Sequence, residues 1–167
     1  MLLSESQSDL PRLESIGFNR KQLKCETEIE ASPELIWQIL TDLSAFPEWN
    51  PFIKGASGTL KKGEKLTVTM HPTGGRATTF KTTVLSVEPN RELRWIGHLG
   101  LPGLFDGEHF FGLNPLTSSR TLFVQREQFG GVLLPFLVGM LKRETSRGFS
   151  EMNLALKARA ERRTAQS

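Results

Sequence analysis

The sequence predicts an α+β domain in which a curved antiparallel sheet of about six to seven strands wraps around one long C-terminal helix. A series of strand-like segments is separated by short turn signals, two short helices interrupt the series after the first strand, and a long amphipathic pattern closes the chain. Short connections between successive strands are typical of antiparallel pairing. Such a sheet needs cover on one face, and the C-terminal helix is the element able to provide it.

The first strand of the domain is expected at residues 22–30. Charged side chains occupy the even positions from Lys24 to Glu30, and uncharged side chains, Cys25 among them, occupy the odd positions. A period of two with one charged face predicts a half-buried strand. Before it, residues 1–21 are polar and are interrupted by Pro11 and Gly17, so we expect a loosely ordered N-terminal arm with at most a short helix around residues 11–16. Residues 22–163 are expected to form a single domain.

A helix start follows this strand. Ser32 is a favourable N-cap residue and Pro33 a favourable first helical residue, and residues 35–40 supply an apolar stripe. The segment 46–51, Phe-Pro-Glu-Trp-Asn-Pro, cannot continue the helix because proline lacks the backbone donor and restricts the residue before it. A short second helix or turn is therefore expected there.

The remaining strands are expected near residues 52–58, 65–71, 78–88, 91–98, 105–114 and 120–129. Turn residues separate them, including Lys62-Gly63, Thr73-Gly74-Gly75 and Pro89-Asn90.

The chain ends in a helical pattern over residues 133–162, with Pro135 in its first turn. Gly148 falls on the apolar stripe, although glycine inside a helix costs roughly 1 kcal/mol relative to alanine. Two interpretations remain open for it: close packing of the helix on the sheet, or room for a ligand.

Composition excludes several classes of protein. Hydrophobic residues make up 38% and charged residues 23% of the chain, as in globular proteins. No apolar run reaches the ~18 residues of a transmembrane helix, and the N-terminus lacks the features of a secretory signal. Because Cys25 is the single cysteine, no internal disulfide can form, and we expect a cytoplasmic protein.

Charged groups and histidines give no sign of a nucleic-acid or metal partner. The net charge is +3, and the basic residues of the C-terminal helix are interleaved with glutamates, as on a solvated helix face. His71, His98 and His109 lack metal-ligand spacing. We therefore expect no nucleic acid, no metal and no cofactor.

The chain resembles the SRPBCC superfamily, which includes START-type lipid-binding domains and the birch-pollen-allergen proteins. It is most similar to the bacterial polyketide cyclase/dehydrase-like branch, over residues 22–161 in order. The segments that carry the resemblance are SPELIW (32–37), TDL (41–43), FPEWNPFI (46–53), PNRELRW (89–95), GEHFF (107–111), EQFGG (127–131), and residues 148–149, 152–153 and 155–157.

The resemblance implies a helix-grip fold with a deep hydrophobic cavity. It does not transfer an activity, because this fold hosts many functions. Cyclases of the superfamily position a poly-keto chain with polar groups that often include arginine and tyrosine. This sequence contains no tyrosine, which weighs against a cyclase.

Strand alternation selects polar side chains that face the interior. His109 shares its parity with Phe111 and Leu113, and Gln125 and Glu127 share theirs with Phe123 and Phe129. By the same rule, His98 is expected outside. One interpretation is a polar cluster of His109, Gln125 and Glu127 in an apolar cavity, with His109 and Glu127 as the candidate catalytic pair. The other interpretations are ordinary structural pairing and anchoring of a ligand without chemistry.

We therefore expect a protein that binds a small hydrophobic ligand: a lipid, quinone, polyketide or aromatic compound. One alternative is an enzyme of the cyclase or dehydratase type, and a second is a protein-interaction module with an exposed apolar patch. The oligomeric state stays open between monomer and homodimer. We expect Trp37, Phe46 and Trp49 near the entrance; the expected ligand-binding residues are Trp37, Phe46, Trp49, Trp95, His109, Phe111, Phe123, Gln125, Glu127, Met140 and Phe149.

Overall fold

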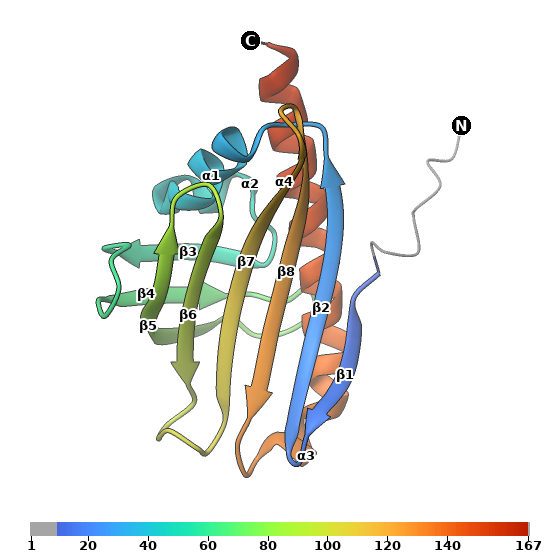
Figure 1. The fold of residues 1–167 in the computed structure, drawn as a ribbon. Helices are drawn as coiled ribbons and strands as arrows, with labels where there is room; N and C mark the ends of the chain where they lie inside the picture. Colours follow the sequence, from blue (N-terminus) through green and yellow to red (C-terminus); the bar gives the residue numbers. More distant parts are fainter. Residues whose placement is uncertain (1–9, 167) are drawn as a thin grey trace.

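The computed structural model describes residues 10–166 and shows one curved antiparallel sheet holding a long C-terminal helical segment against its concave face (Figure 1). The sheet has eight strands in the order β1-β2-β8-β7-β6-β5-β4-β3. The strands are β1 (Arg12–Gly17), β2 (Arg20–Ile29), β3 (Ile53–Gly58), β4 (Lys65–Met70), β5 (Thr78–Glu88), β6 (Glu92–His98), β7 (Asp106–Thr117) and β8 (Arg120–Gly130).

The predicted α+β class and helix-grip architecture are confirmed, with one strand more than expected. The additional strand is β1, which pairs antiparallel with β2 from Arg12↔Lys24 to Gly17↔Arg20. The prediction of a short helix around residues 11–16 was therefore wrong. Residues 1–9 of the predicted arm lie outside the described residues, and the division at residue 22 stays a prediction.

The short helices between β2 and β3 begin and end where the sequence predicts. They are α1 (Pro33–Thr41), the 3₁₀ turn η2 (Leu43–Ala45) and α2 (Phe46–Trp49). The Ser32 hydroxyl accepts a hydrogen bond from the Leu35 N–H at 3.3 Å, as an N-cap does. After α2, the buried Asn50 side chain accepts from the N–H groups of Phe52 and Ile53 at 3.0 and 2.8 Å. These bonds fix the sharp turn into β3.

The C-terminal helical segment consists of three parts: α3 (Leu134–Met140), the π turn η3 (Leu141–Thr145) and α4 (Ser146–Ala165). In the π turn, the Ser146 N–H donates to the Leu141 carbonyl five residues earlier. Most of α3 is exposed, and Leu134 is its buried residue. Over α4, in contrast, a stripe that includes Phe149, Met152 and Leu156 is fully buried against the sheet.

Gly148 lies where α4 packs directly on Phe52, the residue before β3. A Cβ atom at this position would be 2.2 Å from Cδ2 of the buried Phe52 ring. Close packing on Phe52 therefore explains this glycine.

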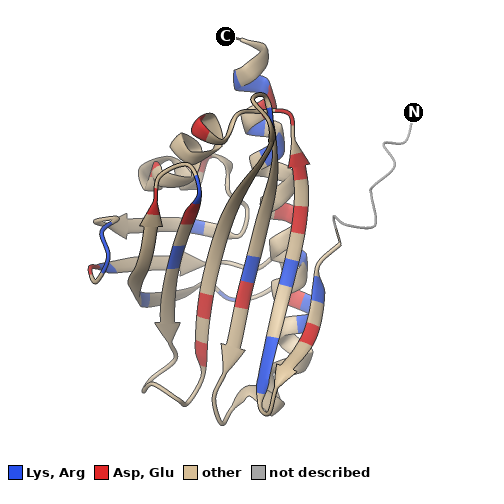
Figure 2. Ribbon diagram, in the orientation of Figure 1, with Lys and Arg blue, Asp and Glu red and all other residues tan. Residues whose placement is uncertain are grey.

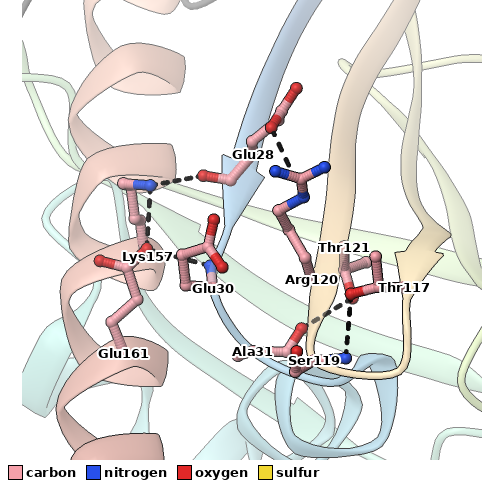
Figure 3. Close-up of polar contacts among 9 residues, drawn as sticks. All are labelled: Glu28, Glu30, Ala31, Thr117, Ser119, Arg120, Thr121, Lys157 and Glu161. Atoms are coloured by element: carbon pink, nitrogen blue, oxygen red, sulfur yellow. Dashed lines mark hydrogen bonds and ion pairs between the residues drawn. The ribbon is translucent and has the colours of Figure 1, made fainter.

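Polar contacts fasten the C-terminal half of α4 to the end of β2 and the residues that follow it (Figure 3). Glu161 accepts from the Glu30 N–H at 3.0 Å and pairs with Lys157 at 2.9 Å, and Lys157 donates to the Glu28 carbonyl. Beside them, the Thr121 hydroxyl donates to the Ala31 carbonyl at 2.9 Å. This end of the molecule is thus held by directional bonds, whereas α3 at the other end contributes little to the core.

No helix in the described part of the chain is both long and apolar enough to cross a membrane.

Candidate functional site

A cavity of about 320 Å³ lies between the concave face of the sheet and the C-terminal helical segment. Its walls come from the end of β4, the first half of β5, the end of β6, the start of β7 and the end of β8, and η3 borders it from the opposite side. Its mouth is at the lower end of the molecule in Figure 1, since the exposed side chains of Leu99 and Met140 belong to its lining. The volume is within the range of small-molecule sites.

His109 and Glu127 face this cavity from adjacent strands. They are directly paired positions of β7 and β8, so both side chains leave the same face of the sheet at the same height. His109 is 1% exposed and Glu127 is 7% exposed. Their nearest polar atoms, His109 Nδ1 and Glu127 Oε2, are 3.7 Å apart. That separation is too long for a direct hydrogen bond.

A glycine on β7 makes room for the carboxyl group. A Cβ atom on Gly107 would be 2.8 Å from Glu127 Oε1. A larger residue there would displace the carboxyl group from the position it occupies beside His109.

Gln125 determines which nitrogen of the His109 imidazole ring carries the proton. Its side-chain amide nitrogen lies 3.1 Å from His109 Nε2 and 3.4 Å from the Met152 sulfur. An amide nitrogen only donates, so Nε2 of a neutral His109 accepts and the proton is on Nδ1. The Nδ1–H group then points toward the Glu127 carboxyl and the cavity.

Burial makes both groups neutral near pH 7. Desolvation lowers the pKa of His109 to about 3 and raises the pKa of Glu127 to about 8. The distance would admit an ion pair, but charging either group in this apolar surrounding is unfavourable. At neutral pH the pair therefore presents an N–H donor and a protonated carboxyl group.

Three buried polar atoms on the cavity wall have no hydrogen-bond partner among residues 10–166. They are His109 Nδ1, Glu127 Oε2 and the hydroxyl of Thr82. A buried polar group without a partner costs about 1–3 kcal/mol. A ligand oxygen placed between them would accept from these donors and remove that cost.

Aromatic rings surround the pair. The His109 ring centroid lies 5.5 Å from Trp95, 4.5 Å from Phe111 and 5.3 Å from Phe149. Rings at these distances exclude water from the imidazole and hold its orientation. The pair thus lies among aromatic rings in a mainly apolar cavity, whose wall also carries polar side chains such as Thr82 and His98.

The structure places the predicted site residues in three groups. Trp95, His109, Glu127 and Met140 line the cavity. Phe111, Phe123, Gln125 and Phe149 are buried but are not part of the lining, and His109 contacts all but Phe123. Trp37, Phe46 and Trp49 lie on α1 and α2, outside the lining found over residues 10–166.

The predicted position of the entrance is corrected accordingly. Phe46 and Trp49 pack edge to face at 5.4 Å and belong to the hydrophobic core beneath the short helices. The mouth opens at the other end of the sheet. His98, predicted to face outside, is paired with Asp106 at 2.6 Å and also reaches the rim of the cavity.

Sequence reasoning missed the contribution of β4 and β5 to the wall. Val68 on β4, and Phe80 and Thr82 on β5, line the cavity. The signal was present, because Thr78, Phe80, Thr82 and Val84 alternate with polar residues along β5.

Comparison with known proteins agrees with this fold. Residues 22–161 match the family model described as polyketide cyclase/dehydrase and lipid transport. A START superfamily protein from Mycobacterium smegmatis is similar at 26% identity and a TM-score of 0.68, over 84% of this chain and 97% of that chain. No curated protein matches the sequence.

Two enzymes share the fold at lower identity. The Zhui aromatase/cyclase from Streptomyces sp. R1128 matches at 16% identity with a TM-score of 0.73, over 87% of this chain and 96% of that chain. A norcoclaurine synthase point mutant from Thalictrum flavum matches at 16% identity with a TM-score of 0.67, over 90% and 99% of the two chains. At such identity the likeness concerns the fold alone.

Proposed function

This chain belongs to the polyketide cyclase/dehydrase and lipid transport family, and from that premise we propose that it binds a small hydrophobic ligand in the cavity under its sheet. The ligand would be a lipid, quinone, polyketide or aromatic compound that carries at least one oxygen. The observation that carries the proposal is the pair of unpartnered donors, His109 and Glu127, on the wall of a mainly apolar cavity.

The family and the chemistry of the lining both support this function. Phe80, Trp95 and Phe129 on the lining offer apolar contact, which is worth about 25 cal/mol per Å² removed from water. A carbonyl or hydroxyl oxygen between His109 Nδ1 and Glu127 Oε2 would fix the orientation of the ligand. The cytoplasm stays the expected location.

Filling the mouth of the cavity is expected to weaken ligand binding. Thr78 is exposed on β5 and belongs to the lining, whereas its neighbour Thr79 is exposed and bonds the Thr69 hydroxyl at 2.9 Å. Thr78→Trp should weaken binding of phenylnaphthylamine, a neutral apolar fluorescent probe, by about tenfold, because the indole occupies the same volume.

Thr79→Trp is the matched control and should change the dissociation constant by less than about twofold, since its side chain leaves the strand on the opposite face. Equal binding by the two variants, at equal unfolding temperatures, would show that the probe binds elsewhere. Native mass spectrometry of the purified protein would identify any ligand that co-purifies.

A second candidate function is acid catalysis on a ketone, and the neutral carboxyl group of Glu127 favours it. A protonated Glu127 can donate its proton to a carbonyl oxygen as a base in solvent removes a proton from the neighbouring carbon, which gives the enol. Near pH 7, a carboxyl group with a pKa of about 8 is in the form that this step needs.

Deuterium incorporation next to the carbonyl of benzylacetone would test this chemistry. Wild type should accelerate the exchange in D₂O, and Glu127→Gln should lose at least about tenfold of that acceleration, because the amide cannot transfer a proton. Binding of benzylacetone should stay within about twofold, since the amide still donates a hydrogen bond. An unchanged exchange rate in the Glu127→Gln variant would contradict the acid role of Glu127, and ligand binding alone would remain as the proposed function.

A further inference from the structure

Large apolar side chains are exposed at the end of the molecule where the cavity opens. Phe18 is fully exposed, Phe136 is 83% exposed, Leu101 76% and Val132 65%. Leu99 and Met140, at 42% and 38%, belong to the cavity lining itself. We call these six residues the apolar rim.

Hydrogen bonds join the segments that carry the apolar rim. The Asn19 side chain in the β1–β2 turn donates to the Gly131 carbonyl at 2.7 Å. The N–H groups of Val132 and Leu133 donate to the carbonyls of Gly103 and Leu104 in the β6–β7 loop, both at 3.0 Å. The β1–β2 turn, the β6–β7 loop and the start of α3 therefore form one connected surface, at the lower end of Figure 1.

Cationic side chains stand close to this surface. Arg20 follows Phe18 on β2, Arg76 belongs to the cavity lining, and Lys142 and Arg143 follow Met140; all four are exposed. In Figure 2 the turns at the lower end are free of charged residues, and a basic stretch lies just above them on β2.

Two carboxylates at this end, Asp106 and Glu144, have partners. Asp106 accepts from the Gly103 N–H at 2.9 Å and pairs with His98 at 2.6 Å, and Glu144 pairs with Arg143 at 3.4 Å. Arg143 is therefore offset by Glu144, and Arg20, Arg76 and Lys142 are the cations that border the apolar rim.

We propose that the apolar rim docks on the surface of a lipid bilayer that contains anionic lipids. Protruding aliphatic and aromatic side chains bordered by cations suit the boundary between acyl chains and anionic headgroups. A protein partner would be favoured by a groove or one continuous flat patch. Here the apolar groups are instead the tips of separate turns and the exposed side of α3.

Docking in this orientation would place the cavity mouth against the bilayer. Leu99 and Met140 would contact acyl chains, so a hydrophobic ligand could move between bilayer and cavity without crossing water. This last step rests on the proposed ligand binding, whereas docking itself does not.

Flotation with vesicles tests the proposal. Wild type should float with vesicles of phosphatidylcholine and phosphatidylglycerol, and less with vesicles of phosphatidylcholine alone. The double variant Val132→Ser/Phe136→Ser should partition at least about tenfold less, because it removes two of the side chains that would insert. The cavity-filled variant Thr78→Trp should float no less than wild type although it binds ligand more weakly, because an indole at the mouth favours the bilayer interface; this separates docking from ligand binding.

The matched control is Leu116→Ser/Leu154→Ser, which removes two exposed apolar side chains, at 43% and 48%, away from the apolar rim. It should float like wild type. The proposal is overturned if wild type does not float, or if the control loses as much as the rim variant. It is also overturned if the rim variant turns a dimer into a monomer in lipid-free light scattering, since the surface would then be an interface between two copies.

Discussion

Replacing Gly148 by alanine is expected to destabilise the fold by about 3 kcal/mol, at the upper end of the usual cost of overpacking. The new Cβ atom would lie 2.2, 2.5 and 2.7 Å from three carbons of the Phe52 ring. That ring is 3% exposed and packs against Phe149 at 6.0 Å, so it cannot swing into solvent. Either α4 moves off the sheet or Phe52 shifts toward the cavity, which it lines.

Gly139→Ala is the matched control and should increase the free energy of unfolding, whereas Gly148→Ala decreases it. A Cβ atom at Gly139 meets no heavy atom within 4 Å among the described residues, and alanine favours an exposed helix by roughly 1 kcal/mol. Urea unfolding of both variants measures the two effects. A Gly148→Ala protein as stable as wild type would mean that Phe52 moves freely, and that the cavity extends beneath α4.

Glu127→Gln is expected to abolish the loss of stability of the wild type above pH 6.5. Burial raises the pKa of Glu127 from 4.5 to about 8, so the folded state keeps a proton that the unfolded state releases. Its contribution to stability is complete below pH 4.5 and is lost as the pH rises to 8. His109 acts oppositely: its pKa falls from 6.5 to about 3, so its contribution is complete above pH 6.5 and is lost toward pH 3.

The two effects offset each other between pH 4.5 and 6.5, and only the Glu127 effect operates from pH 6.5 to 8. At about 1.4 kcal/mol per pH unit, wild type should lose about 2 kcal/mol over that interval. In urea unfolding, the stability of Glu127→Gln should stay constant from pH 6.5 to 8. His109→Gln should still lose stability over that interval, but it should no longer show the loss that His109 causes between pH 6.5 and 3. A wild-type profile that is flat from pH 6.5 to 8 would contradict the raised pKa of Glu127.

The polar pair could be predicted from the sequence because it depends on local rules. Alternation places Gln125 and Glu127 on the buried face of β8, and a tight hairpin fixes the register that brings Glu127 opposite His109. Both rules operate within the β7–β8 hairpin, although the register shifts once, between Pro115 and Thr117.

The mouth of the cavity depends on long-range geometry. Trp37, Phe46 and Trp49 carry the aromatic and proline pattern of a loop at a rim, but that pattern does not say at which end of the sheet the chamber opens. The position of the mouth depends on how the β4–β5 loop, the β6–β7 loop and η3 come together around it. Strand β1 was missed because its side chains are mostly exposed on both faces, so no period-two pattern marks it. The strand is defined by its pairing with β2.

The π turn has a consequence for the length of the chain. Leu141 and Phe149, both buried, are eight residues apart, and at about 100° per residue a straight α-helix would separate them by about 80° around its axis. A π turn accommodates roughly one extra residue, which brings the two to the angular relation of a heptad pair, about 20° apart. A homologue one residue shorter within 141–145 could therefore form an uninterrupted α-helix with both apolar faces still toward the sheet. An insertion or deletion in the middle of α4 would instead rotate part of its apolar face into solvent.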